Sequence, residues 1–400
     1  MPKVFKAPPN KHERVFLMNV LKKVFLIICA SFALILSPFL KRSRINYQGG
    51  HYIFLDSFKS DMDAGIRTTR EFYSLLSKSN DCCKIDINLN TIQIWRLLKQ
   101  TKCYKNSIVV IRSPGFLIKF MALELLLWRK FKIAFYTGDI YHKRYISERM
   151  ASGDNRKIKT KIIVYKLIEK VLWKYSDAVL SPCNDEAEYI RAFNDNSFVL
   201  PIRFFSESDF LQQQIRIEQK PPSNNLEFDF VFVGGVSHPP NRGAVINILT
   251  ELAPVISQKY PNSRIYIIGK GWDTAALNAP SNVEFTGMIS DQELEKYLER
   301  AQFLLCPLPY GAGVKGKVIE SMFYGLTIVS NSVGWQGIDA DFAEPLELTC
   351  DQVAFIDQIM NDKRELSKNA TKYRNYLLTN YSERNAELLD KQLRRSLDQK

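Results

Sequence analysis

Short apolar runs that alternate with helical patterns constrain the fold of this chain more than any other feature. One series lies between residues 51 and 200, and a second series of the same kind begins after residue 226. The clearest strand-like runs are 51–55, 107–111, 132–136, 229–233, 264–268, 303–306 and 327–330. Strands that alternate with helices predict parallel sheets with helices on both faces. We therefore expect an α/β fold with two Rossmann-like domains in tandem.

A polar segment at 206–225, which contains Pro221-Pro222 and Asn224-Asn225, separates the two series and is typical of a connector. Ligands of open parallel sheets bind at the carboxyl ends of the strands, so the cleft between the two domains is the expected active site. The predicted parts are a basic tail with a hydrophobic membrane-anchor helix at 1–45, an N-terminal Rossmann-like domain at 46–205, a linker at 206–226, a C-terminal Rossmann-like domain at 227–375, and a C-terminal helix at 376–400 that can pack back on the N-terminal domain.

The N-terminus contains an uncharged apolar run of 17 residues at 24–40, with basic residues on both sides. This length is the lower limit for a helix that spans a bilayer, and Pro38 shortens the usable helix. A spanning or half-inserted anchor is favoured over a buried core helix. A half-inserted helix is preferred to a span, because a span would place the short N-terminal tail on the far side.

The net positive charge of the chain comes from its first half. Residues 1–205 carry 35 Lys and Arg against 17 Asp and Glu, whereas residues 206–400 carry 20 against 25. A basic half joined to a mildly acidic half indicates that one half meets a polyanion. An anionic membrane surface is favoured over nucleic acid, since the basic half lacks a motif in which aromatic and basic residues interleave.

Glycines in the second half follow the predicted strands, where backbone amides can approach a ligand closely. Gly234, Gly235, Gly287, Gly311 and Gly313 occupy such positions. Neither Gly-x-Gly-x-x-Gly nor the P-loop pattern occurs, which disfavours a dinucleotide dehydrogenase and a P-loop enzyme.

The segment 311–320 offers three kinds of group that a nucleoside diphosphate requires. Gly313 and Val314 would expose backbone N–H groups, and Lys315 and Lys317 would bring two cations to a diphosphate. Glu320 would supply a carboxylate that accepts two hydrogen bonds from a ribose diol. A solvated basic loop before a helix is the alternative interpretation.

These residues belong to a longer resemblance. Residues 232–338 resemble the donor-binding half of the family 4 (group 1) glycosyltransferases, which have the GT-B fold, and in particular a subgroup whose donor loop reads Gly-Ala-Gly-Val-Lys. Residues 63–67, 136–144 and 176–181 with Glu186 match the first half more weakly. The resemblance implies two Rossmann-like domains whose parallel sheets face a central cleft.

The resemblance also implies roles for residues of the second half. Glu320 corresponds to the acid that binds the ribose, whereas the family's other acid is replaced by Ala312. Arg242 and Lys315, with Lys317 as a further candidate, would neutralise the diphosphate, and the base would lie near Gly287.

In the first half, the resemblance makes Asp139 and His142 candidates for contact with the reacting sugar or the acceptor hydroxyl. Asp63 and Gly65 would lie in a loop near the acceptor. Two Asp-x-Asp triplets fall outside a plausible metal context, so we expect neither a metal nor a cofactor; the nucleotide sugar is a substrate.

The sequence thus predicts a retaining glycosyltransferase that moves a sugar from a nucleotide-sugar donor to a membrane-linked glycan or lipid. Its expected place is the cytoplasmic face of the inner (plasma) membrane, in the synthesis of a bacterial surface polysaccharide such as lipopolysaccharide. Two alternatives stay open. The replacement of an acid by Ala312 is compatible with a non-catalytic relative that binds nucleotide sugars, and a sugar-nucleotide epimerase can share the fold.

Overall fold

The computed structural model describes residues 41–42, 51–56, 64–86, 107–127, 129–219, 229–273 and 277–398. The predicted membrane-anchor run at 24–40 lies outside them. Among the described residues, no helix combines the length and the apolar character needed to cross a membrane.

The N-terminal domain is built on a parallel sheet in the order β3-β2-β4-β6-β7-β8. Its strands are β2 (His51–Asp56), β3 (Asp81–Asp86), β4 (Ser107–Arg112), β6 (Lys132–Tyr136), β7 (Ala178–Ser181) and β8 (Ser197–Val199). A separate pair is formed by β1 (Lys41–Arg42) and β5 (Arg129–Lys130). The helices are α2 (Ala64–Leu76), α4 (Pro114–Leu127), α5 (Tyr141–Ser152), α6 (Arg156–Tyr175) and α7 (Asn184–Arg191).

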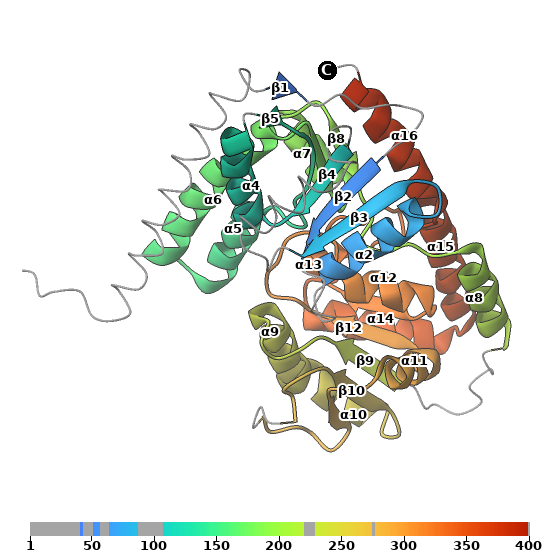
Figure 1. Ribbon diagram of the computed structural model, residues 1–400. Coiled ribbons are helices and arrows are strands. Elements are labelled where there is room, and N and C mark those ends of the chain that lie inside the picture. Colours follow the sequence, from blue (N-terminus) through green and yellow to red (C-terminus); the bar gives the residue numbers. More distant parts are fainter. Residues whose placement is uncertain are drawn as a thin grey trace, which may run out of the picture.

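Alternate residues of each strand point to opposite faces of this sheet. Ile53 and Leu55 of β2 pack in a cluster with α4 and α6. Tyr52 and Phe54 pack on the other face with α2 and with α16 (Arg384–Asp398), the last described helix of the chain. The C-terminal helix therefore covers the N-terminal sheet (Figure 1).

The C-terminal domain contains a second parallel sheet in the order β11-β10-β9-β12-β13. Its strands are β9 (Asp229–Val233), β10 (Arg264–Ile268), β11 (Val283–Gly287), β12 (Phe303–Cys306) and β13 (Thr327–Ser330). The helices are α9 (Pro239–Asn247), η3 (Ile248–Leu252), α10 (Ala253–Lys259), α11 (Asp291–Arg300), α12 (Gly316–Phe323), α13 (Ser332–Trp335), α14 (Thr349–Asn361) and α15 (Arg364–Asn380). The prediction of two parallel α/β sheets is confirmed.

The segment predicted as a polar linker contains a helix, α8 (Glu207–Gln219). Phe210 lies on its buried side and contacts Phe205 and Phe323, which joins α8 to the core of the C-terminal domain. The many glutamines of this segment made it resemble a loop in the sequence. It still forms a helix, because a few apolar residues on one side are enough to anchor it.

Candidate functional site

The loop between β12 and α12 carries the predicted donor-binding residues, and we call residues 311–315 the donor loop. Gly313 adopts a φ of 68°, a left-handed conformation that favours glycine. Helix α12 begins at Gly316, and its N-cap residue Lys315 makes no side-chain cap hydrogen bond. The first N–H groups of a helix have no partner within the helix, so this end of α12 suits an anionic group.

Lys315 folds back over the donor loop. Its Nζ donates to the carbonyl oxygens of Ala312 (3.1 Å) and Gly313 (2.5 Å) and to Oε1 of Gln336 (3.2 Å). Burial lowers the pKa of Lys315, while the charge of nearby Asp139, and that of Glu186 when it is ionised, act in the opposite direction. The ammonium group therefore holds the loop in shape and brings positive charge beside it.

Lys317 lies in the first turn of α12, and its side chain reaches the turn after the neighbouring strand β9. Its Nζ donates to Oδ1 of Asn241 (2.8 Å) and lies 4.0 Å from the ring centroid of Phe232. Asn241 in turn donates to the carbonyl of Gly235. Burial, the largest effect, together with the charge of Lys315, lowers the pKa of Lys317 to about 8. An anionic ligand placed here would stabilise the charged form of the lysine.

The glycine turn after β9 requires residues without side chains. At Gly234, with a φ of 148°, an added Cβ would lie 2.5 Å from Nδ2 of Asn241 and 2.9 Å from Nζ of Lys317. The carbonyl of Gly234 accepts a hydrogen bond from Nε1 of Trp272 (2.6 Å). Gly234 and Lys317 thus lie together, as expected for parts of one phosphate-binding site.

Two other predicted donor residues lie further out. Arg242 is exposed on α9, in its first half. Gly287 ends β11 with a φ of 67°, and its carbonyl accepts a hydrogen bond from the backbone N–H of Gly269 (3.0 Å). Neither residue contacts the donor loop through a described hydrogen bond or ion pair.

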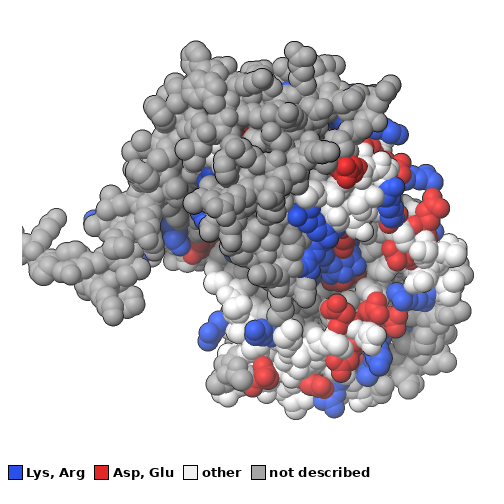
Figure 2. Space-filling model, in the orientation of Figure 1, with Lys and Arg blue, Asp and Glu red and all other residues white. Residues whose placement is uncertain are grey.

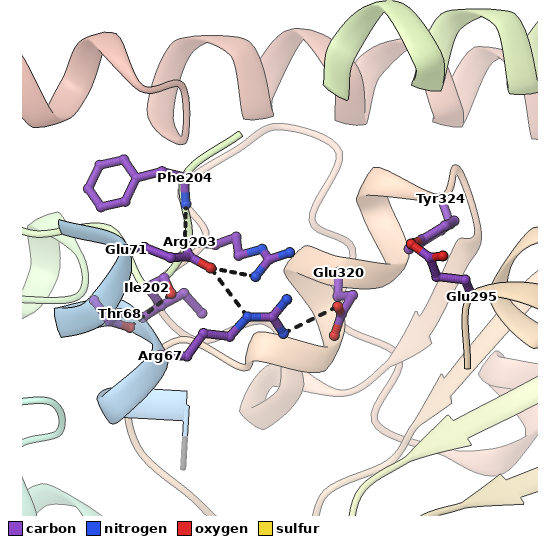
Figure 3. Close-up of polar contacts among 9 residues, drawn as sticks. All are labelled: Arg67, Thr68, Glu71, Ile202, Arg203, Phe204, Glu295, Glu320 and Tyr324. Atoms are coloured by element: carbon purple, nitrogen blue, oxygen red, sulfur yellow. Dashed lines mark hydrogen bonds and ion pairs between the residues drawn. The ribbon is translucent and has the colours of Figure 1, made fainter. Parts of the chain in front are cut away.

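Glu320 lies on α12 and faces the N-terminal domain. Its Oε1 is 3.6 Å from Nη1 of Arg67 on α2, and the two side chains point toward each other in Figure 3. Arg67 also donates to Glu71, which accepts a second bond from Arg203 (2.5 Å). Figure 2 shows basic side chains gathered on this face around α2. The predicted ribose-binding carboxylate is thus partly exposed and paired across the two domains.

The loop after β6 and helix α5 meet the donor loop from the other side. The backbone N–H of Gly311 donates to Oγ of Ser147 (3.1 Å), and Nη2 of Arg144 lies 2.8 Å from Nε2 of His238. Partial burial, followed by the charge of Arg144, lowers the pKa of His238 to about 4. The ring of His238 is therefore neutral at physiological pH and can accept a hydrogen bond from Arg144.

Asp139 and His142 do not share one environment. Asp139 lies against Gly313 of the donor loop, whereas His142 is buried with an exposed fraction of 3%. Nδ1 of His142 is 2.6 Å from Glu169, and its Nε2 is 3.1 Å from the hydroxyl of Tyr189. The structure therefore brings Asp139 to the site but places the ring of His142 in the interior of the N-terminal domain.

The structure says little about the two residues that were predicted to lie near the acceptor. Gly65 lies in the first turn of α2, and Asp63 lies outside the described residues. Within the described ranges, no group of three His, Cys, Asp or Glu side chains is arranged to hold a metal ion.

Several residues at the site were missed as functional candidates. Arg67, Arg144, Ser147, Glu186, His238, Asn241, Trp272 and Gln336 all contact the donor loop or the predicted site residues. Arg67, Arg144, Glu186 and Asn241 are within the motifs that carry the resemblance, which is the signal that could have singled them out. Trp272 and Gln336 make their contacts within the C-terminal domain, whereas the contact of Ser147 depends on how the two domains dock.

Part of the C-terminal domain is similar to a known family. Residues 227–361 match the family described as glycosyl transferases group 1. A 44.6 kDa protein in the cps region of Klebsiella pneumoniae is 26% identical over 151 residues, which represent 34% of this chain and 37% of that protein. The aligned part thus spans little more than a third of that relative.

Solved structures resemble the chain over most of its length. Anabaena Alr3699/HepE, in complex with UDP-glucose, has a TM-score of 0.56 at 13% identity and covers 88% of this chain and 100% of its own. A glycosyltransferase from Rickettsia africae has a TM-score of 0.54 at 14% identity, with coverage of 88% and 98%. TarM has a TM-score of 0.56 at 18% identity, with coverage of 76% and 57%.

At these identities the structural likeness establishes the fold alone. The family match concerns residues 227–361. Both agree with the resemblance inferred from the motifs. Residues 227–361 therefore match the group 1 glycosyltransferases, and the chain has a GT-B-like fold of two α/β domains.

Proposed function

We propose that this protein is a retaining glycosyltransferase that transfers a sugar from a nucleotide-sugar donor. The observation that carries the proposal is the convergence of Lys315, Lys317 and the N-terminus of α12 beside the glycine turn after β9. In the same helix, Glu320 offers a carboxylate for the ribose. The UDP-glucose complex of HepE, which has the same fold, supports a nucleotide sugar as the donor.

The resemblance to the group 1 glycosyltransferases implies the chemistry of the transfer. The bond between the anomeric carbon and the diphosphate oxygen breaks, and the acceptor oxygen forms a bond to that carbon on the same face of the sugar. The acceptor proton passes to a phosphate oxygen of the leaving group. Lys317, Lys315 and the first amides of α12 stabilise the negative charge that develops on the diphosphate. The exposed Arg242 is a further cation that can approach it when the donor is bound.

The acceptor is proposed to be a glycan or lipid held at a membrane. Helix α6 presents an exposed stripe in which Ile163 and Leu167 lie among basic residues, and Met150 of α5 is 82% exposed. The basic members of the stripe are Lys159, Lys166, Lys170 and Lys174. Apolar side chains flanked by lysines suit the surface of an anionic bilayer. The relative in a cps region supports a role in surface polysaccharide synthesis. The proposed location is the cytoplasmic face of the inner membrane, where a nucleotide-sugar donor is available.

The donor site is tested with Glu320→Ala. The variant should lose transfer activity by about a hundredfold or more while its melting temperature stays close to that of the wild type, because Glu320 is partly exposed and not part of a core. The measurement is sugar transfer from a panel of UDP-, GDP-, ADP- and dTDP-linked hexoses to a membrane extract. Glu387→Ala, an exposed position on α16, is the matched control.

Unchanged transfer by Glu320→Ala would refute the assignment of the donor site. Two other outcomes would favour the rival functions. Binding of a nucleotide sugar without turnover would indicate a non-catalytic relative, and conversion of the nucleotide sugar without any acceptor would indicate an epimerase.

The membrane surface is tested by vesicle sedimentation. Replacing Ile163 and Leu167 by Gln, and Lys159 and Lys166 by Glu, should weaken the binding of the full-length protein to vesicles that contain phosphatidylglycerol. Vesicles of phosphatidylcholine alone are the control for charge. Equal binding of variant and wild type to the anionic vesicles would exclude this face as the docking surface.

A further inference from the structure

Two carboxyl groups of the N-terminal domain face the donor loop. A Cβ added to Gly313 would collide with Oδ1 of Asp139 and would lie 3.8 Å from Oε1 of Glu186. Gly313 directly follows Ala312, the position at which the resemblance predicts an acid and the chain has none. Acidic groups are thus present at this point of the site, but they come from the opposite domain.

Glu186 is an unusual member of this pair because it is buried. It lies in the first turn of α7 with an exposed fraction of 5%. Its Oε2 has no hydrogen-bond partner in the part of the chain that the structure describes. A buried polar atom without a partner destabilises the folded state, so its presence in a native protein calls for an explanation, such as a catalytic role or a bound group.

We infer that Asp139 and Glu186 bind hydroxyl groups of the donor's sugar and supply the acidic contact that Ala312 cannot make. This inference rests on the proposed function, since it assigns the sugar-binding part of the same site. A sugar that enters there replaces the contact between Asp139 and Gly313, and the missing side chain at Gly313 leaves the loop backbone next to the ring.

The protonation of the two carboxyls suits this role. Burial, followed by the charge of Asp139, raises the pKa of Glu186 to about 8, so Glu186 is protonated near neutral pH. Its carboxyl then donates one hydrogen bond, while the Asp139 carboxylate accepts. A sugar hydroxyl can both donate and accept, so two neighbouring hydroxyls can satisfy both groups at once.

The electrostatic surroundings support one charge on the pair and not two. The cations near Glu186 are Lys143 and Lys315, and the carboxyl also accepts a hydrogen bond from the backbone N–H of Ile140. Arg144 is 3.9 Å from Oδ2 of Asp139. Arg144 thus places a positive charge beside Asp139, whereas burial favours the neutral form of Glu186.

The experiment compares the affinities of a nucleotide sugar and of the corresponding nucleoside diphosphate. The hexose nucleotide that raises the melting temperature of the wild type most is chosen from the UDP, GDP, ADP and dTDP series, and dissociation constants are measured by calorimetry. Glu186→Ala and Asp139→Asn should each weaken binding of the nucleotide sugar by about tenfold. Their affinities for the nucleoside diphosphate alone should stay within about twofold of the wild type.

Two further variants sharpen the test. Glu186→Gln keeps a neutral group that can donate a hydrogen bond, so its affinity for the nucleotide sugar should stay near that of the wild type. Glu188→Ala, an exposed position on the same helix, is the matched control and should change neither affinity. If Glu186→Ala fails to fold, Asp139→Asn decides the question, because the side chain of Asp139 is 35% exposed.

The outcomes separate the inference from the proposed function. Equal binding of the nucleotide sugar by the wild type, Glu186→Ala and Asp139→Asn would overturn the inference and leave the donor site intact. Parallel loss of both ligands would also overturn it, because the carboxyls would then act on the loop and not on the sugar. Failure of the wild type to bind any nucleotide or nucleotide sugar would instead refute the proposed function.

Discussion

At the scale of single residues, Lys317 is a buried cation whose charged form an anionic ligand would stabilise. Its ammonium group is held by Asn241 and the ring of Phe232, with Lys315 as a neighbouring cation. These neighbours do not compensate fully for the loss of water, so the pKa falls to about 8. A diphosphate would restore the missing negative charge.

The pH dependence of diphosphate binding follows from this shift. Lys317 is charged below pH 8 and neutral above it, so the site should lose attraction for a diphosphate as the pH rises. Between pH 8 and pH 9.5, where the phosphates are almost fully ionised, the affinity for the nucleoside diphosphate should fall by about tenfold. Calorimetry across this range, in buffers of different ionisation enthalpy, should also show proton uptake on binding near pH 8.

Lys317→Met provides the comparison for this prediction. It should bind the nucleoside diphosphate more weakly at pH 7 and show a flatter pH profile. An unaltered profile in Lys317→Met would assign the titration to another group. Lys315 is then the first candidate, because burial lowers its pKa as well.

At the scale of secondary-structure elements, α16 is the clearest case of an element whose role depends on its packing partner. Its apolar face lies on the N-terminal sheet, although it follows the C-terminal domain in sequence. Leu389, Leu393 and Leu397 are buried there, and Asp390 accepts a 2.5 Å hydrogen bond from the hydroxyl of Tyr52. The helix thus links the two domains (Figure 1).

Leu393→Ala should therefore destabilise the protein. The side chain is fully buried, and removing it leaves a cavity between α16 and the sheet. The expected loss is about 2–5 kcal/mol in the free energy of unfolding, measured by urea denaturation. Leu388→Ala is the matched control because Leu388 is 55% exposed, and it should change stability by less than about 0.5 kcal/mol. Similar effects of the two substitutions would contradict this packing of α16.

At the scale of the whole molecule, polar contacts between the domains surround the proposed site. They join Arg67 to Glu320, Arg144 to His238 and Ser147 to Gly311. The pair of Arg67 and Glu320 concerns function directly, because a ribose that binds Glu320 must share or displace Arg67. The contact is partly exposed, so its contribution to stability is small.

Arg67→Ala tests whether this pair competes with the donor. Releasing Glu320 should raise the affinity for the nucleoside diphosphate by at most about fivefold and reduce its dependence on salt. Calorimetry at two salt concentrations provides the measurement. Weaker binding in the variant would contradict competition and would show that Arg67 contributes a favourable contact to the donor. Lys78→Ala removes another exposed interdomain pair, with Glu383, and serves as the control.

Much of the architecture follows from local pattern. The runs at 132–136, 229–233, 264–268, 303–306 and 327–330 are strands, because continuous apolar runs of this length suit the interior of a parallel sheet. The glycine positions were predictable for a similar reason. Gly313 and Gly287 have positive φ angles, which few other residues adopt without strain. The motifs also indicated the resemblance to group 1 glycosyltransferases, and residues 227–361 match that family.

Docking of the two domains decided the remainder. Asp139 and His142 are three positions apart, yet one faces the donor loop and the other packs inside its own domain, because the start of α5 turns them to different sides. The approach of Glu186 to Gly313 joins residues more than a hundred positions apart. Local sequence fixes backbone preference and apolar periodicity, which act over a few residues. Contacts between the domains depend on the shape and charge complementarity of two folded surfaces, and only the tertiary structure determines it.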